Sequence, residues 1–139
     1  MFNKYFIVPI LLFVCSVGFC QSDYGAIDQR SKTVPDSITD YKLITKYLTD
    51  GLTGEREKVR AIYIWIAHNI KYDLAQLNSE KRYNSNQEII NEAMATKKGV
   101  CQHYSELFCA MGASIGLKTY LIKGYTRDAL GEIADLSHA

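Results

Sequence analysis

The sequence lacks an excess of charge of either sign. Its 139 residues include 16 basic and 15 acidic side chains, and they contain no low-complexity tract and no internal repeat. A nearly neutral chain has no electrostatic attraction that would favour nucleic acid or an anionic membrane surface. We therefore expect no nucleic-acid partner. A chain of this length is also sufficient for one domain with a buried core.

Long hydrophobic runs are lacking too, with one exception at the N-terminus. Residues 1–20 read MFNKYFIVPILLFVCSVGFC, with Lys4 near the start and small residues before a cleavage site after Cys20. The apolar run between them is short for a membrane span and typical of a secretory signal; an uncleaved N-terminal anchor is the alternative. Large residues precede both of its cysteines, which argues against a lipoprotein. We expect an exported protein, periplasmic or extracellular, without stable membrane association after signal cleavage.

Cysteine is scarce once this segment is set aside. Cys15 and Cys20 lie in the expected signal, which leaves Cys101 and Cys109. If residues 100–115 form one helix, these two cysteines lie about 12 Å apart, whereas a disulfide requires Cα atoms within about 7 Å. We therefore expect no disulfide between them: both are free thiols, or one pairs with another chain.

The strongest helical pattern begins near Thr53, the expected N-cap. Glu55 and Glu57 place negative charge in the first turn, where the helix dipole favours it. Apolar residues then recur at helical spacing and cover much of the circumference, which indicates a central helix. They are Val59, Ile62, Tyr63, Trp65, Ile66 and Ile70.

The remaining pattern predicts helices first and strands last. Residues 21–36 lack a clear period and are expected to be a flexible lead-in, and Ser37 and Gly51 bound an expected short helix. Further helices are expected over residues 87–95 and 100–115, before the pattern becomes alternating over 117–127. A turn over 128–131 and a returning strand over 132–139 indicate an α+β fold with helices packed on an antiparallel β-sheet. Two strands alone are marginal, so this sheet looks incomplete at the C-terminus.

Cys101 follows Gly99 and Val100 at the expected start of a helix. Unpaired N–H groups and the positive end of the helix dipole favour a thiolate there, and the same N–H groups can bind an oxyanion. The competing interpretation is a buried packing cysteine, because free cysteine is among the most buried residue types. Cys109, in the middle of the same helix, is expected to be such a packing residue.

A cysteine nucleophile needs a histidine within hydrogen-bond reach. His68 lies inside the central helix, and His103 is two positions after Cys101, so its side chain points to a different side of the helix. His138, on the expected returning strand, is the histidine that can meet Cys101 across a helix–sheet contact. A metal site built from the last two histidines, Cys101 and Cys109 lacks the close paired spacings of zinc sites, so we expect no metal and no cofactor.

Four segments occur in a specific order between residues 37 and 139. They are Trp65-Ile66 leading to Asn69-Ile70 and Tyr72-Asp73, then Gly99-x-Cys101-x-x-Tyr104, then Gly124-Tyr125, then His138-Ala139. Each is weak alone, but the set is specific, and it resembles the transglutaminase-like core, in particular its kyphoscoliosis-peptidase-like subgroup. The resemblance implies a transglutaminase-like domain over residues 37–139 with a Cys-His-Asp triad related to that of papain-like proteases.

The resemblance also implies roles for two residues. Cys101 would be the nucleophile that forms a thioester with an amide of a protein or peptide substrate. His138 would take the thiol proton and later protonate the leaving amine. Transfer of the acyl group to water gives hydrolysis, and transfer to an amine gives a crosslink. Framework roles are implied for Trp65, Tyr72, Tyr104 and Tyr125.

The third member of that triad is missing from its expected place. In the family the motif continues past His-Ala with Trp and Asn, and the aspartate follows on the next strand. Asp128 and Asp135 both precede His138, so neither fits. We therefore expect a chain cut short after His138, part of an exported cysteine enzyme. The alternative is a catalytically inactive transglutaminase-like interaction module; the oligomeric state stays open in both.

Overall fold

The computed structural model describes residues 24–77, 81–127 and 130–138, and side-chain surroundings as far as Ile133. The expected signal over residues 1–20 and the centre of the expected turn at 128–129 lie outside the described residues. None of the described helices is long and apolar enough to cross a membrane.

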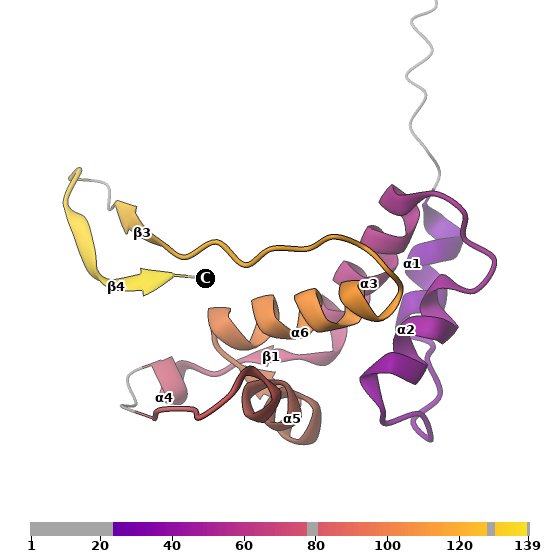
Figure 1. The fold of residues 1–139 in the computed structure, drawn as a ribbon, viewed down its shortest axis with the longest axis horizontal. Coiled ribbons are helices and arrows are strands. Elements are labelled where there is room, and N and C mark those ends of the chain that lie inside the picture. Colours follow the sequence, from indigo (N-terminus) through magenta and orange to yellow (C-terminus); the bar gives the residue numbers. More distant parts are fainter. Residues whose placement is uncertain (1–23, 78–80, 128–129, 139) are drawn as a thin grey trace, which may run out of the picture.

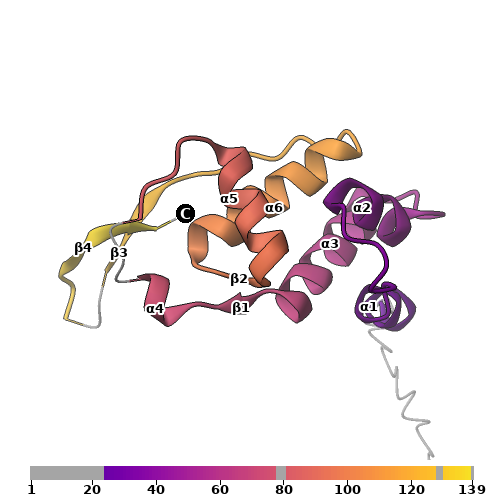
Figure 2. The same ribbon diagram turned by 90° about the horizontal axis from the view of Figure 1, so that it is seen from below.

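Six helices and four short strands are described (Figures 1 and 2). In chain order they are α1 (Gly25–Lys32), α2 (Tyr41–Thr49), α3 (Glu55–Asn69), β1 (Lys71–Tyr72), α4 (Leu74–Leu77), α5 (Asn86–Thr96), β2 (Lys98–Gly99), α6 (Cys101–Ser114), β3 (Gly124–Arg127) and β4 (Ile133–His138). In both views α1 and α2 lie at one end of the molecule and the β3–β4 pair at the other, with α6 between them.

The core forms where α2, α3 and α6 pack against one another. Ile62, Trp65 and Ile66 of α3 are buried, which confirms the expected central helix. They pack in one cluster with residues of the neighbouring helices, among them Ile44, Leu48, Leu107 and Met111. Two members of the expected stripe lie at its margin, because Val59 and Tyr63 are exposed.

Two of the expected helix caps are wrong. The N-cap of α2 is Asp40 and not Ser37, because the Asp40 carboxylate accepts hydrogen bonds from the N–H groups of Lys42 (2.8 Å) and Leu43 (3.1 Å). A carboxylate next to two unpaired amides is a strong cap. The N-cap of α3 is Gly54 and not Thr53. The expected end of α2 at Gly51 is confirmed, with the left-handed φ of 75° that glycine adopts without strain.

The lead-in over residues 21–36 also differs from the expectation, because Gly25–Lys32 forms helix α1 packed on α3. An ion pair helps to attach it: Arg60 donates from Nε and Nη2 to the two carboxylate oxygens of Asp28, each at 2.7 Å, and Ile27 packs against the core. Ser31 is buried and donates to the carbonyl of Ile27 (2.8 Å). A helix attached in part by polar contacts carries little apolar periodicity, which is why the pattern did not predict it.

The strands agree with the expected fold class only in part. The chain is a mixed helix-and-strand protein, but the expected antiparallel sheet covered by helices is not shown. The expected strand over residues 117–127 is a strand only at Gly124–Arg127, where it pairs antiparallel with β4. Residues 117–123 have no strand partner among the described residues, so their alternation does not produce a ladder. An unexpected second pair, β1 with β2, is parallel and two residues long.

Candidate active site around Cys101

Two segments far apart in sequence meet at the start of α6. The N–H of Lys71 donates to the carbonyl of Lys97 (2.9 Å), and the N–H of Asp73 donates to the carbonyl of Gly99 (3.0 Å). These bonds extend the β1–β2 pair on both sides. The chain that leaves α3 therefore fixes the residues directly before Cys101.

Cys101 is the first residue of α6, and its thiol is free and half-buried. Val100 is the N-cap, and its carbonyl accepts from the N–H groups of His103 (2.9 Å) and Tyr104 (3.3 Å). The N–H groups of Cys101 and Gln102 have no acceptor among residues 24–77, 81–127 and 130–138. The thiol therefore lies where unpaired amides and the positive end of the helix dipole favour negative charge.

Cys109 lies in the middle of α6, in a different setting. It is half-buried and contributes to an apolar cavity of about 430 Å³, together with Ile66, Tyr104 and Phe108. Its carbonyl accepts a hydrogen bond from the Thr119 hydroxyl (3.2 Å). No helix end is near it, and its surroundings are those of a packing residue.

His103 is fully buried, and both of its ring nitrogens have partners. Nδ1 accepts from the N–H of Val100 (3.2 Å), and Nε2 lies 3.0 Å from the hydroxyl of Tyr83. Because Nδ1 accepts, the ring proton is on Nε2 and is donated to Tyr83. Burial lowers the pKa of His103, which favours this neutral form. Such an imidazole has no free nitrogen with which to take the proton of Cys101.

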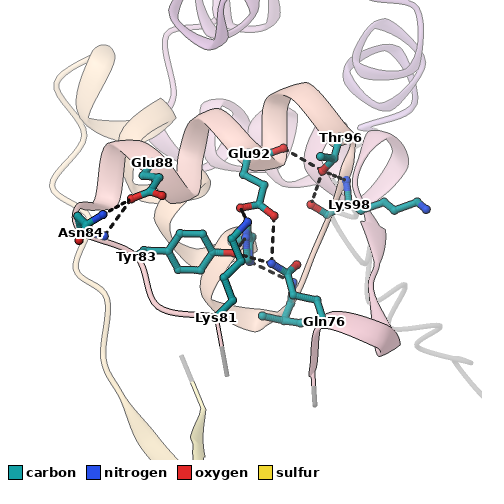
Figure 3. Close-up of polar contacts among 10 residues, drawn as sticks. Gln76, Lys81, Tyr83, Asn84, Glu88, Glu92, Thr96 and Lys98 are labelled. Carbon is teal, nitrogen blue, oxygen red and sulfur yellow. Dashed lines mark hydrogen bonds and ion pairs between the residues drawn. The ribbon is translucent and has the colours of Figure 1, made fainter. Parts of the chain in front are cut away.

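Four polar side chains continue this contact away from α6 (Figure 3). Glu92 accepts from Lys81 (2.6 Å) and from the amide of Gln76 (3.2 Å), and the same amide donates to the Tyr83 hydroxyl. Pairing with Lys81 lowers the pKa of Glu92, and burial raises that of Tyr83 to about 12. The cluster therefore consists of one carboxylate, one ammonium and neutral groups at neutral pH.

The sequence did not predict this cluster. Its members come from α4, the segment that precedes α5, α5 itself and α6, and their spacing follows no period. One local signal is the pair Gly99 and His103. A Cβ built on the buried Gly99 would lie 2.4 Å from Cβ and 2.6 Å from Cγ of His103, so glycine is required by that side chain.

The expected framework residues differ in their surroundings. Trp65 is buried, and the Lys97 ammonium lies 5.2 Å from its ring centroid. Tyr104 donates its hydroxyl proton to the carbonyl of Ile70 (2.5 Å), and its ring lies 6.2 Å from the half-exposed ring of Tyr72. Tyr125, by contrast, is 68% exposed in the described part of the chain, so no framework role is visible for it there.

His138 is the last residue of β4, paired in register with Gly124. Its side chain lies outside the described part, so no contact between it and Cys101 is described. In both views, however, β4 ends beside the first turn of α6 (Figures 1 and 2). Asp135 lies in the same strand, Asp128 is outside the described residues, and His68 is exposed on α3.

Metal-ligand side chains do not gather in the described ranges. No group of three His, Cys, Asp or Glu residues that can bind a metal ion is found there. The partners of His103, a backbone amide and a tyrosine hydroxyl, are also not metal ligands in this arrangement.

Comparison with known proteins identifies a family and two relatives. Residues 42–139 match the transglutaminase-like superfamily. Human kyphoscoliosis peptidase is 31% identical over 86 residues, which are 62% of this chain and 12% of that protein. The mouse kyphoscoliosis peptidase is 32% identical over 74 residues, which are 53% of this chain and 11% of that protein. The chain thus aligns with about a tenth of the length of these relatives, and no solved structure matches it. With its cysteine at the start of α6, the chain belongs to the transglutaminase-like superfamily.

Proposed function

We propose that this chain supplies the thiol nucleophile of a cysteine enzyme that acts on amides of proteins or peptides. The observation that carries the proposal is the position of Cys101: a free thiol at the first residue of a 14-residue helix, beside two amides without an acceptor in the described structure. Family membership makes acyl transfer or hydrolysis the expected chemistry for a thiol in that position.

The reaction begins with attack of the Cys101 sulfur on the carbonyl carbon of the substrate amide. The carbonyl oxygen becomes an oxyanion, which the N–H groups of Cys101 and Gln102 stabilise. The proton of the thiol passes to His138, which then gives it to the leaving amine as the C–N bond breaks and a thioester forms. Water or a primary amine attacks the thioester, releases the acid or the new amide, and restores the thiol.

The other histidines fit the role of base less well. His103 is buried with both nitrogens engaged, and His68 is exposed on α3. We assign the base to His138 because β4 ends beside the first turn of α6 in both views (Figures 1 and 2). The N-terminal segment supports export as part of the same proposal, so the substrate would be met outside the cytosol.

The two cysteines of α6 provide a matched test. A peptide that contains glutamine is incubated with the protein and a labelled primary amine, and both acid and amide products are measured. Cys101→Ala is expected to abolish both products, whereas Cys109→Ala, the same change eight residues later on the same helix, should retain most of the activity. Product formation by Cys101→Ala at the original rate would contradict the assignment of the nucleophile.

The thiol can also be tested without a substrate. Cys101 is expected to react with iodoacetamide near neutral pH at least about tenfold faster than Cys109, because the helix start favours its thiolate. Glu106 lies between the two cysteines, so cleavage after lysine and glutamate places them on separate peptides for mass spectrometry. Equal, slow alkylation of both residues in the folded protein would refute the proposal.

A second candidate is a catalytically inactive interaction module. The observation in its favour is a set of large apolar side chains, each more than half exposed, in β3, in the segment before it and at the start of β4. Exposed apolar groups of this kind are typical of contact surfaces. They are Tyr120, Ile122, Tyr125 and Ile133. Capture of a protein partner that is unchanged by Cys101→Ala and lost when Tyr120 and Ile122 become serine would favour this function.

A further inference from the structure

The start of α6 contains an imidazole that the proposed reaction does not use. His103 is fully buried, and it is bonded to the N–H of Val100 through Nδ1 and to the Tyr83 hydroxyl through Nε2. A buried histidine has to bond both nitrogens to avoid an unsatisfied polar group. What distinguishes this one is which amide it bonds.

Val100 is the N-cap of α6, and His103 is the third residue of the helix. A side chain at that position that accepts from the N-cap amide is one half of a capping box, a place normally taken by glutamate or glutamine. The bond orients the Gly99–Val100 peptide, next to Cys101. Because His103 takes the Val100 amide, the amides of Cys101 and Gln102 are the ones left for the chemistry at the sulfur.

The imidazole that caps Val100 is uncharged, and this affects the sulfur of Cys101. A glutamate at the same position would place a negative charge in the first turn, near the sulfur, where it would oppose both the thiolate and the oxyanion. A neutral imidazole accepts the same hydrogen bond without that charge. Capping by His103 is thus compatible with a reactive thiol in a way that capping by a carboxylate is not.

The Tyr83 cluster fixes the direction of the bond. Lys81 pairs with the Glu92 carboxylate, Glu92 accepts from the Gln76 amide, and the same amide donates to the Tyr83 hydroxyl. The Tyr83 oxygen lies 3.0 Å from Nε2 of His103, and as it accepts the Nε2 proton it leaves Nδ1 as the acceptor for the Val100 amide. A histidine that faced only solvent would exchange between its two neutral forms, and one of these has no acceptor for Val100.

We propose that His103 is a positioning residue for Cys101: as a neutral acceptor bonded by Tyr83, it fixes the Val100 amide and hence the turn that presents the thiol. This inference rests on the proposed function, because it concerns the reactivity of the same sulfur. It adds a requirement for an acceptor at the position of Nδ1, which a purely space-filling role for His103 does not have.

The test compares three variants of the full chain by the rate at which iodoacetamide alkylates Cys101, with Cys109 as the internal reference. In His103→Asn the amide oxygen takes the place of Nδ1, so the rate at Cys101 should stay within about threefold of the original. His103→Leu fills a similar volume but has no acceptor for the Val100 amide, and the rate should fall about tenfold, the equivalent of about 1.4 kcal/mol. The rate at Cys101 in Tyr83→Phe should lie between the rates in these two variants.

The outcomes separate this inference from the proposed function. If Cys101 is no faster than Cys109 in the unchanged protein, the reactive thiol itself is contradicted. If Cys101 is fast in the unchanged protein and equally fast in His103→Leu, only the positioning role is overturned.

A variant that opens the fold would speed alkylation of Cys109 as well. In that case the test is nitrogen-15 NMR of the histidines in the unchanged protein, which shows which ring nitrogen of His103 carries the proton. An unprotonated Nδ1 and a protonated Nε2 at His103 are expected, and a proton on Nδ1 overturns the inference.

Discussion

Gly99→Ala is expected to destabilise the protein strongly through a single contact. The added Cβ would lie 2.4 Å from Cβ and 2.6 Å from Cγ of His103, and neither atom is at the flexible end of the side chain. His103 cannot turn away without leaving the Val100 amide and the Tyr83 hydroxyl without their partner. Overpacking costs about 1–3 kcal/mol, and an unpaired buried polar group costs about 1–3 kcal/mol. We expect the free energy of unfolding to fall by about 3–4 kcal/mol.

Urea unfolding followed by tryptophan fluorescence measures this change directly. The chain has one tryptophan, and Trp65 is buried in the core, so its emission reports unfolding of the helices around it. Gly124→Ala is the matched control, because a Cβ there meets no atom within 4 Å. We expect that control to change the free energy of unfolding by less than about 0.5 kcal/mol.

A double-mutant cycle assigns the cost to His103. The two closest atoms are Cβ and Cγ of that residue, so the partner substitution is His103→Gly, since alanine would keep the nearer of the two. In the His103→Gly background, Gly99→Ala should cost less than about 1 kcal/mol. If Gly99→Ala cost the same in the original protein and in His103→Gly, the reasoning would be refuted. A Gly99→Ala variant as stable as the original protein would refute it too.

Three further predictions concern stability and processing. Burial lowers the pKa of His103, so the unfolded chain binds more protons below about pH 6.5, and the free energy of unfolding should fall as the pH drops from there; His103→Asn should flatten this part of a urea-unfolding pH series. The lowered pKa of Glu92 adds a loss only at more acidic pH, below about 4.3. Leu107→Ala, at a fully buried position, should cost about 2–5 kcal/mol in urea unfolding, whereas Leu74→Ala, at a position 69% exposed, should cost less than about 0.5 kcal/mol. Finally, expression with a secretory pathway should yield a mature chain that begins at Gln21, which N-terminal sequencing checks; an intact Met1 in the exported fraction would contradict the expected signal.

Four of the described helices, α2, α3, α5 and α6, could be predicted from apolar residues at helical spacing, with glycines just beyond the ends of α2 and α6. The expected helix over residues 87–95 is observed as Asn86–Thr96, and that over residues 100–115 as Cys101–Ser114. Caps were less predictable, since Ser37 and Asp40 are both good capping residues and only the fold decides between them. Helix α1 was missed because Ile27 is one of its few apolar residues and an ion pair between Asp28 and Arg60 helps to attach it, which leaves little periodic trace.

The strands were predicted less well for a related reason. Alternation of side chains shows that a segment can form a strand, but a strand also needs a partner for its backbone. Residues 117–123 alternate without such a partner in the described structure, whereas β1 and β2 pair although each is too short to show any pattern. Pairing depends on which segments the helices bring together, and that information is distributed over the whole chain.

The site shows the same division between local and distributed information. Position along α6 was readable from the sequence, and it separates Cys101 at the helix start from Cys109 in the middle. The role of His103 was not, because its spacing from Cys101 argued against a base and a zinc ligand but gave no sign of a cap. Only the surroundings decide: burial, the Val100 amide and the Tyr83 hydroxyl together occupy both nitrogens. The reactivity of Cys101 should therefore depend on residues from α4 and α5, and a change at Glu92 should reach the sulfur through Gln76, Tyr83 and His103.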